Sequence, residues 1–271
     1  MNDLLEIESA LTLSRLRGVG AATFKDLIEQ YGSPSIALNH FCEQKTNKKT
    51  PLNIQEALDF LKANPEVKMF WPFHKSYPKS LSIITEPPPV LFCTGNEKIL
   101  KSKKLKVAIV GARKASPAGL EYTKEIVQKL CQEGAVIVSG LAEGIDACAH
   151  QVALEEGCET IAVMATGIDV CYPKKNADLF QAIASKGIIC TEFFPGTPPM
   201  ASFFPTRNRI IAAFSDIIIM VEGTAKSGAL YTVRNGLKFN KKVFVGNYNE
   251  HDITKEGLIK AVALGANIFT A

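Results

Sequence analysis

The chain has 271 residues, of which 46% are hydrophobic and 21% are charged. This balance is typical of an ordinary globular protein and excludes the disordered and fibrous classes. The net charge of +4, from 31 basic and 27 acidic residues, permits a nucleic-acid ligand without indicating one, so any binding surface must come from local clustering.

Residues 1–65 predict a small all-helical domain. Apolar side chains at helical spacing mark two helices, one with Leu4, Leu5, Leu11 and Leu16 and one with Phe24, Leu27, Ile28 and Tyr31. The polar run 42–51 predicts a loop, and Asn53 ahead of Glu56 predicts the cap of a further helix.

A glycine-containing turn joins the first two predicted helices. The run Leu16-Arg17-Gly18-Val19-Gly20 resembles a helix-hairpin-helix turn, in which glycines allow backbone amides to approach a phosphate. An ordinary turn in a small helical bundle explains the same residues equally well. The domain is therefore expected to be SAM-like or helix-hairpin-helix-like.

Residues 66–104 are expected to form a linker and a lead-in strand. Tyr77-Pro78 and the triple proline 87–89 favour extended backbone, and the apolar run 90–93 predicts a short strand. A cluster of lysines follows, and a solvated face is the simplest interpretation of it: Lys98, Lys101, Lys103, Lys104 and Lys106.

From residue 105 to 271, continuous apolar runs alternate with helical segments. Such runs are typical of strands in a parallel sheet that is covered on both faces, and they occupy 106–110, 135–139, 160–165, 188–192, 216–222 and 242–246. The alternation is a βαβ pattern. It predicts an α/β fold with a Rossmann-like, doubly wound, mostly parallel sheet, in which ligands bind beyond the carboxyl ends of the strands.

The first of these strand ends has features of an anion site. Gly111 allows close approach of the backbone, Arg113 can bind phosphate oxygens with its forked guanidinium, and Ser116 precedes Pro117 at a predicted helix start. The run is neither a G-x-G-x-x-G fingerprint nor a P-loop. Dinucleotide and ATP sites are therefore disfavoured.

The second strand ends in SGLAEGID (139–146). Ser139, Gly140 and Gly144 are candidates for a backbone amide nest that binds an anion. Asp146 and His150 share a helix face, and with Ser139 they suggest a hydrolase triad. Because a G-x-S-x-G elbow is missing, Asp146 is instead expected to cap the turn and His150 to be structural.

The third strand is followed by an aromatic residue and cations in the run Tyr172-Pro173-Lys174-Lys175-Asn176. Single-stranded nucleic acid needs this combination, because cations bind its phosphates and aromatic rings stack on unpaired bases. Lys174, Lys175 and Asn176 are therefore candidate contacts. Phe180 is expected either to stack on a base or to pack in the core.

Two further helix starts carry polar residues. Arg207, Asn208 and Arg209 open one helix, and the two arginines must point to different sides. One is expected to contact the ligand while the other holds the loop through Glu192 or Glu222. Ser227-Gly228 opens the next helix and offers another amide site.

These motifs, in this order and spacing, resemble the DNA-processing protein A (DprA/Smf) family from about residue 11 to residue 268. The resemblance implies single-stranded DNA binding without nucleotide hydrolysis, a homodimer, protection of incoming DNA and loading of a RecA-type recombinase during natural transformation. Glu143 departs from the family, which usually has a basic residue there, and so does Val245-Gly246-Asn247, where many members have Pro-Gly. The C-terminal winged helix of many members is expected to be absent.

The last helix is expected to form the dimer interface. The segment 253–264 predicts a short helix capped near Thr254, and its apolar stripe is wider than packing on the sheet requires: Leu258, Ile259, Val262 and Leu264. A second subunit is expected to cover part of it in a two-fold contact, as in the DprA relatives.

The remaining features argue against a metal, a cofactor and a membrane. The seven cysteines include no C-x-x-C pair and the four histidines have no metal-ligand spacing. The acidic N-terminus is unlike a signal peptide, and no apolar run reaches the ~18 residues of a membrane span. A cytoplasmic protein with reduced thiols is therefore expected.

Two alternative functions stay open. Glu222-Gly223-Thr224 resembles the LOG (lysine-decarboxylase-like) nucleoside-monophosphate glycosidases, although the full PGGxGT signature is absent. A nucleotide-sensing module on the same fold is the other alternative. No catalytic residue is assigned, and the protein is not expected to be an enzyme.

Overall fold

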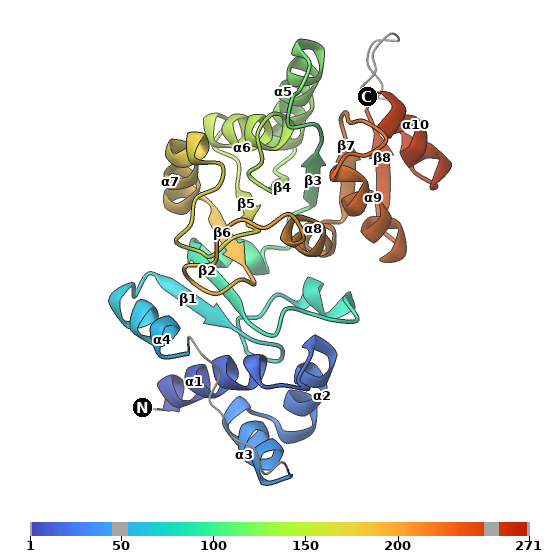
Figure 1. Ribbon diagram of the computed structural model, residues 1–271. Helices are drawn as coiled ribbons and strands as arrows, with labels where there is room; N and C mark the ends of the chain where they lie inside the picture. Colours follow the sequence, from blue (N-terminus) through green and yellow to red (C-terminus); the bar gives the residue numbers. More distant parts are fainter. Residues whose placement is uncertain (1, 45–53, 247–254, 270–271) are drawn as a thin grey trace.

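A nine-stranded sheet in the order β1-β2-β6-β5-β4-β3-β7-β8-β9 organises the molecule (Figure 1). The computed structural model describes residues 2–44, 54–246 and 255–269. The strands are β1 (Val67–Phe70), β2 (Leu91–Gly95), β3 (Lys106–Val110), β4 (Val136–Ser139), β5 (Thr160–Val163), β6 (Ile188–Thr191), β7 (Ile217–Met220), β8 (Lys242–Val245) and β9 (Asn267–Ile268). From β6 to β9 all neighbours are parallel, whereas β2 is antiparallel to both β1 and β6. The predicted α/β class and the doubly wound, mostly parallel sheet are confirmed.

Helices cover both faces of the sheet. One face packs against α5 (Pro117–Gln132), α6 (Ile145–Glu155) and α7 (Ala177–Lys186), and the other against α8 (Phe203–Phe214) and α9 (Ala229–Lys238). The helix α10 (Lys255–Ala263) lies beside α9 and β8. Within the described residues, no helix is long and apolar enough to cross a bilayer.

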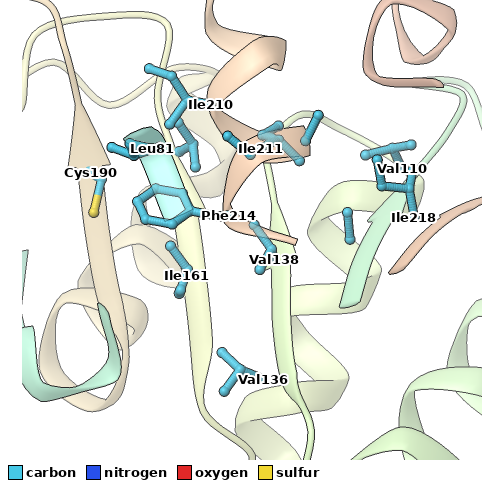
Figure 2. Close-up of a cluster of buried hydrophobic side chains, with 14 of the residues drawn as sticks. Leu81, Val110, Val136, Val138, Ile161, Cys190, Ile210, Ile211, Phe214 and Ile218 are labelled. Atoms are coloured by element: carbon cyan, nitrogen blue, oxygen red, sulfur yellow. The ribbon is translucent and has the colours of Figure 1, made fainter. Parts of the chain in front are cut away.

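The strands are apolar at every position because each face has its own buried cluster. In β3, Val107 and Ile109 pack on the side of α5 and α6, and Ala108 and Val110 pack on the side of α8 and α9. Figure 2 shows the second side, where Ile210, Ile211 and Phe214 of α8 lie over strand residues that include Val138, Ile161 and Cys190. Burial of each such side chain contributes roughly 1.5–3 kcal/mol.

The N-terminal bundle consists of α1 (Asn2–Arg15), α2 (Ala21–Tyr31), α3 (Pro34–Gln44) and α4 (Ile54–Ala63). The second predicted stripe is confirmed, since Phe24 and Ile28 are buried. The first is wrong at Leu4 and Leu5, which are 47% and 56% exposed, because Ala10, Leu11 and Leu13 form the buried face of α1 instead. Helix α3 extends to Gln44, so the predicted loop begins later than residue 42. Asn53 and Thr254, the two predicted caps, lie outside the described residues.

The stretch 66–104 joins the bundle to the sheet. It carries β2 at the predicted lead-in strand, the unpredicted edge strand β1, and the short 3-10 helices Lys79–Ile83 and Glu97–Lys101. Trp71 and Phe92 share one buried cluster with Phe24 of the bundle and with Met164 and Ile168, which follow β5. The bundle and the sheet therefore have a common core.

Two basic features lie at opposite edges of the sheet. The lysines that precede β3 are at the amino ends of the strands, away from the predicted ligand edge, and Lys106 is buried with its ammonium group donating to the carbonyl of Ser102. By contrast, Arg15 at the end of α1 lies 4.1 Å from the ring centre of Phe194, which follows β6. The turn at 16–20 is thereby held near the carboxyl edge of the sheet.

Candidate nucleic-acid interface

A cleft of about 320 Å³ lies at the carboxyl ends of β3 and β7. Strand β3 is the point where the strand order reverses, with β4 on one side and β7 on the other, and ligands of doubly wound sheets bind at such points. The walls are the segment 111–114 after β3, the first turns of α8, and the segment 224–232 that leads into α9. Gly111, Arg113, Asn208, Ser227 and Gly228 were predicted as site residues, and the structure brings them together here.

Two glycines in the loop after β4 have very close neighbours. Gly144 has a φ of +75°, and a side chain there would collide with the carbonyl of Ala112. A side chain at Gly140 would collide with the guanidinium of Arg207. Gly144 therefore allows the loops after β3 and β4 to pack against each other, and Gly140 leaves room for the guanidinium of Arg207.

A cation and two aromatic rings form the outer wall. The guanidinium of Arg113 lies 4.7 Å from the ring centre of Phe204, and the rings of Phe204 and Tyr172 are 5.7 Å apart. A small recess of about 30 Å³ between Arg113, Gly140 and Tyr172 continues the cleft. Phe204 was not among the predicted contacts, although an aromatic residue just before a basic helix start is a signal that could have identified it.

The lysines after β5 lie beside the cleft, and one of them is paired. Lys175 Nζ is 2.5 Å from a carboxylate oxygen of Glu143, and both side chains are partly exposed. Lys174 is exposed. The side-chain amide of Asn176 donates to the carbonyl of Leu141 over 3.0 Å, so this residue braces the loop after β4.

Arg207 is a structural residue in this arrangement. It is 4% exposed, and its guanidinium donates to the carbonyl oxygens of Gly140 and Val163 and to the side-chain oxygen of Asn208. Burial lowers the pKa of Arg207 to about 10, against the opposing charge of Asp146. Its donors are directed at the ends of β4 and β5, and the predicted contact of Arg207 with the ligand stays a prediction.

Asn208 and Arg209 also make polar contacts within the protein. The amide of Asn208 donates to the carbonyl of Gly228 over 3.0 Å and so ties α8 to α9. Arg209 points to the other side of α8 and pairs with Glu192 at 2.6 Å, as the helix spacing predicted for one of the two arginines. Burial raises the pKa of Glu192, and the guanidinium of Arg209 opposes this shift.

The two predicted serine contacts are also engaged within the protein. Ser116 caps α5, and its backbone amide and hydroxyl each donate to the buried carboxylate of Glu222 over 2.8 Å. Ser139 is fully buried and donates to the carbonyl of Ile109 over 2.6 Å. Both hydroxyls thus have partners within the protein, and their predicted contact with the ligand stays a prediction.

The triad suggested by Ser139, Asp146 and His150 does not form. Asp146 accepts from the amide of Gly140 at 3.1 Å, which is the expected capping role, and burial raises its pKa. His150 Nδ1 lies 2.7 Å from the hydroxyl of Thr160, and burial lowers the pKa of this histidine to about 3. It is therefore neutral and structural. Phe180 packs in the core, and no group of three or more metal-binding side chains occurs in the described ranges.

Comparisons with known proteins identify related families and folds. The model of a family described as DNA recombination-mediator protein A matches residues 68–271, and one described as a DprA-like N-terminal HHH domain matches residues 6–58. Protein Smf of Synechocystis is 36% identical over 251 residues, which are 86% of this chain and 63% of that protein. The match thus spans slightly less than two thirds of this relative.

Two solved structures share the fold. The X-ray structure of DNA processing protein A from Streptococcus pneumoniae has a TM-score of 0.74 and 33% identity, over 92% of this chain and 83% of that one. The structure of DNA processing protein A from Helicobacter pylori has a TM-score of 0.66 and 34% identity, over 76% of this chain and 92% of that one. The second is described as giving insight into a single-stranded DNA binding mode.

Proposed function

This chain belongs to the DNA recombination-mediator protein A family, and we propose that it binds single-stranded DNA at the cleft beyond β3 and β7. The observation that carries the proposal is the outer wall, where the guanidinium of Arg113 lies on the ring of Phe204 beside Tyr172. Binding of a single strand without sequence preference combines cations for the phosphates with aromatic faces for the bases. The Helicobacter pylori relative, described as a single-stranded DNA binder, supports the same ligand.

We further propose that the protein acts as a recombination mediator on the bound DNA. The protein would protect incoming single-stranded DNA in the cytoplasm and load a RecA-type recombinase on it during natural transformation. It would act by binding alone, without a cofactor or a chemical step. The family description supports the mediator role.

The burial of Glu222 argues against glycosidase activity. A catalytic carboxylate must reach the substrate, whereas Glu222 is fully buried and accepts two hydrogen bonds from Ser116. Release of free base from a nucleoside monophosphate, abolished by Glu222→Gln, would favour the glycosidase.

The central experiment is a salt titration of binding to labelled oligo-dT. Affinity is expected to fall steeply with salt, with a slope of about −0.7 in log K against log salt for each phosphate neutralised. In a second arm, the protein is expected to accelerate strand exchange by a RecA-type recombinase on DNA already coated with a single-strand-binding protein. If oligo-dT does not bind, or binds with an affinity that is insensitive to salt, the proposal of DNA binding at this cleft is refuted. An unchanged rate of strand exchange would refute the proposed loading of the recombinase.

Glu143 is expected to weaken DNA binding, because it neutralises Lys175. Glu143→Gln should raise affinity for oligo-dT about threefold at low salt, since an exposed pair of charges is worth at most ~1 kcal/mol. The gain should vanish at high salt, where such charges are screened. Glu133→Gln, which changes an exposed acid at the opposite edge of the sheet, is the matched control. An unchanged affinity in Glu143→Gln would place the strand away from Lys175.

We also propose that the protein is a homodimer through α10 and β9. Ile259 is 68% exposed, and Val262, Leu264 and Ile268 are exposed beside it, whereas Leu258 is buried against the sheet and is withdrawn from the proposed interface. Ile259→Glu should shift the protein from dimer to monomer at micromolar concentration, because a charge would enter an apolar contact. Light scattering measures the mass. Ile36→Glu, at an exposed isoleucine of α3, should leave it unchanged, and a monomeric wild-type protein would refute the proposal.

A further inference from the structure

A groove of about 550 Å³ runs along β1, at the end of the sheet nearest the N-terminal bundle (Figure 1). It touches every residue from Val67 to Trp71. Successive side chains of a strand point to opposite faces of the sheet, so a groove that reaches all of these residues lies along the edge of the strand. Among the described residues, β1 has β2 on one side and no strand on the other. The backbone of β1 therefore borders the groove.

The open edge of β1 can accept another strand. Every second residue of β1 directs its backbone amide and carbonyl away from β2, and such an edge is a template for further pairing. Extended peptides are recognised in this way when they add a strand to a sheet. Because β1 comprises only Val67–Phe70, an added strand of about four residues, at ~3.3 Å each, would cover it.

The wall on the bundle side of the groove is apolar. Val67, Met69 and Trp71 lie on one face of the strand and belong to the buried cluster that the bundle shares. Helices α1 and α4 continue this wall with four side chains: Leu4, Ile7, Leu58 and Leu61. Leu4 is 47% exposed. A strand added to β1 would place every second side chain against this wall and would cover Leu4.

The rest of the groove is basic. Three exposed lysines line it: Lys62, Lys68 and Lys75. The ammonium group of Lys68 donates to the carbonyl of Pro65 over 2.6 Å, and that of Lys62 lies 3.8 Å from a carboxylate oxygen of Asp59. Glu97 is the acidic residue of the described lining. Three lysines against one glutamate give the lining a positive charge, which favours an acidic occupant.

We propose that this groove binds an extended, acidic segment of a partner protein as an added strand beside β1. Apolar side chains at every second position of the segment pack on the wall formed by α1 and α4. The acidic side chains between them lie on the face of Lys68, which is opposite to the face of Met69. The two faces of β1 thus specify an alternation of apolar and acidic residues. The proposal is independent of DNA binding, because β2, β6, β5 and β4 separate β1 from β3 and the cleft.

Labelled peptides test the charge preference of the groove. The probe is the hexapeptide EVEIEV with blocked ends, and its control is KVKIKV, in which lysines replace the acids. Fluorescence anisotropy should show saturable binding of EVEIEV to the wild-type protein with a micromolar Kd. Binding of KVKIKV should be weaker by about fivefold or more, since each exposed ion pair contributes up to that factor.

Methylation of backbone amides tests strand addition. In a strand that pairs on one side only, alternate amides bond to the neighbouring strand and the others face solvent. EVEIEV methylated on the amides of its three glutamates, and EVEIEV methylated on the amides of its three apolar residues, should therefore differ. One of them should lose binding and the other should keep it. Equal affinities of the two methylated peptides would refute strand addition.

Lys68→Glu tests the basic face. It should weaken binding of EVEIEV about fivefold, because an exposed ion pair is lost. It should also strengthen binding of KVKIKV, because the charges of protein and peptide are then exchanged. A gain of affinity cannot come from a misfolded variant. The absence of this exchange would refute the assignment of the acidic side chains to Lys68.

Leu4→Ser tests the apolar wall. It should weaken binding of both EVEIEV and KVKIKV about fivefold, because it removes an apolar side chain of which half remains to be buried. Leu5→Ser is the matched control, since Leu5 is 56% exposed on the same helix and does not line the groove. Equal losses in the two variants, or no binding of EVEIEV at millimolar concentration, would refute the proposal.

Other occupants of the groove give different results. If oligo-dT displaces EVEIEV, or if Lys68→Glu weakens binding of oligo-dT, the groove binds DNA and the proposal of a protein segment is refuted. If the protein self-associates and Leu4→Ser abolishes the self-association, the occupant is a second copy of the chain, which also refutes it. Binding of oligo-dT that is unchanged in Lys68→Glu and Leu4→Ser leaves the DNA-binding proposal standing whichever result the peptides give.

Discussion

Arg207→Ala is expected to destabilise the fold by about 3–5 kcal/mol, the range for removing one member of a buried charged network. The change leaves the carbonyls of Gly140 and Val163 without their donor and leaves Asp146 buried without the nearby guanidinium charge. Each group would remain desolvated and unpaired, which costs more than the hydrogen bond itself contributes. Urea denaturation measures the loss.

The control for this variant is Arg234→Ala. Arg234 is exposed on α9, where its guanidinium lies 5.9 Å from the ring centre of Tyr231, and its replacement should change stability by no more than about 0.5 kcal/mol. If the Arg207→Ala protein is as stable as the wild type but no longer binds oligo-dT, Arg207 contacts the ligand and does not have the structural role assigned to it.

Arg113→Ala is expected to produce the largest loss of DNA affinity among variants that fold normally. Arg113 is exposed, lies on Phe204 and lines both parts of the cleft. Its replacement removes a phosphate contact and a cation on an aromatic face, which together are worth about tenfold at low salt. The slope of log K against log salt should also fall by about one, equally for all strand sequences.

Arg113→Lys distinguishes charge from shape at this position. Lysine restores the charge, and therefore the salt slope, but it lacks the planar fork and stacks less well on a ring. Affinity should accordingly recover only in part. Fluorescence anisotropy over a series of salt concentrations measures both quantities, and an unchanged affinity in Arg113→Ala would move the binding site away from this wall.

The sheet could be predicted from the sequence because it depends on the pattern of apolar residues along the chain. Continuous apolar runs such as 106–110 require burial on both faces, and the parallel order then brings the strand ends together. The sequence also predicted that Arg207 and Arg209 lie on different sides of α8, because a separation of two residues corresponds to about 200° of rotation around a helix. That spacing predicted two different roles for Arg207 and Arg209 without showing which residue would be buried.

The burial of polar residues was not predicted, because it depends on contacts between residues that are distant in the chain. Ser116 meets Glu222, and Ser139 meets the carbonyl of Ile109. Nothing in the local runs distinguishes these hydroxyls from ones that face a ligand. Strand β1 was missed for a similar reason, because Val67–Phe70 is short and becomes a strand only by pairing with β2.

The common core of the bundle and the sheet also fixes the distance between the turn at 16–20 and the cleft. Trp71 and Phe92 pack with Phe24, and Arg15, just before the turn between α1 and α2, lies on the ring of Phe194. A domain on a flexible linker moves through a volume set by the linker length, and it loses conformational entropy when it binds the same ligand as its neighbour. Here the turn at 16–20 and the cleft are held by one packed interior, so that loss does not arise. If a DNA strand runs from the cleft toward the bundle, the distance between its contacts at the cleft and at the turn is fixed by the fold.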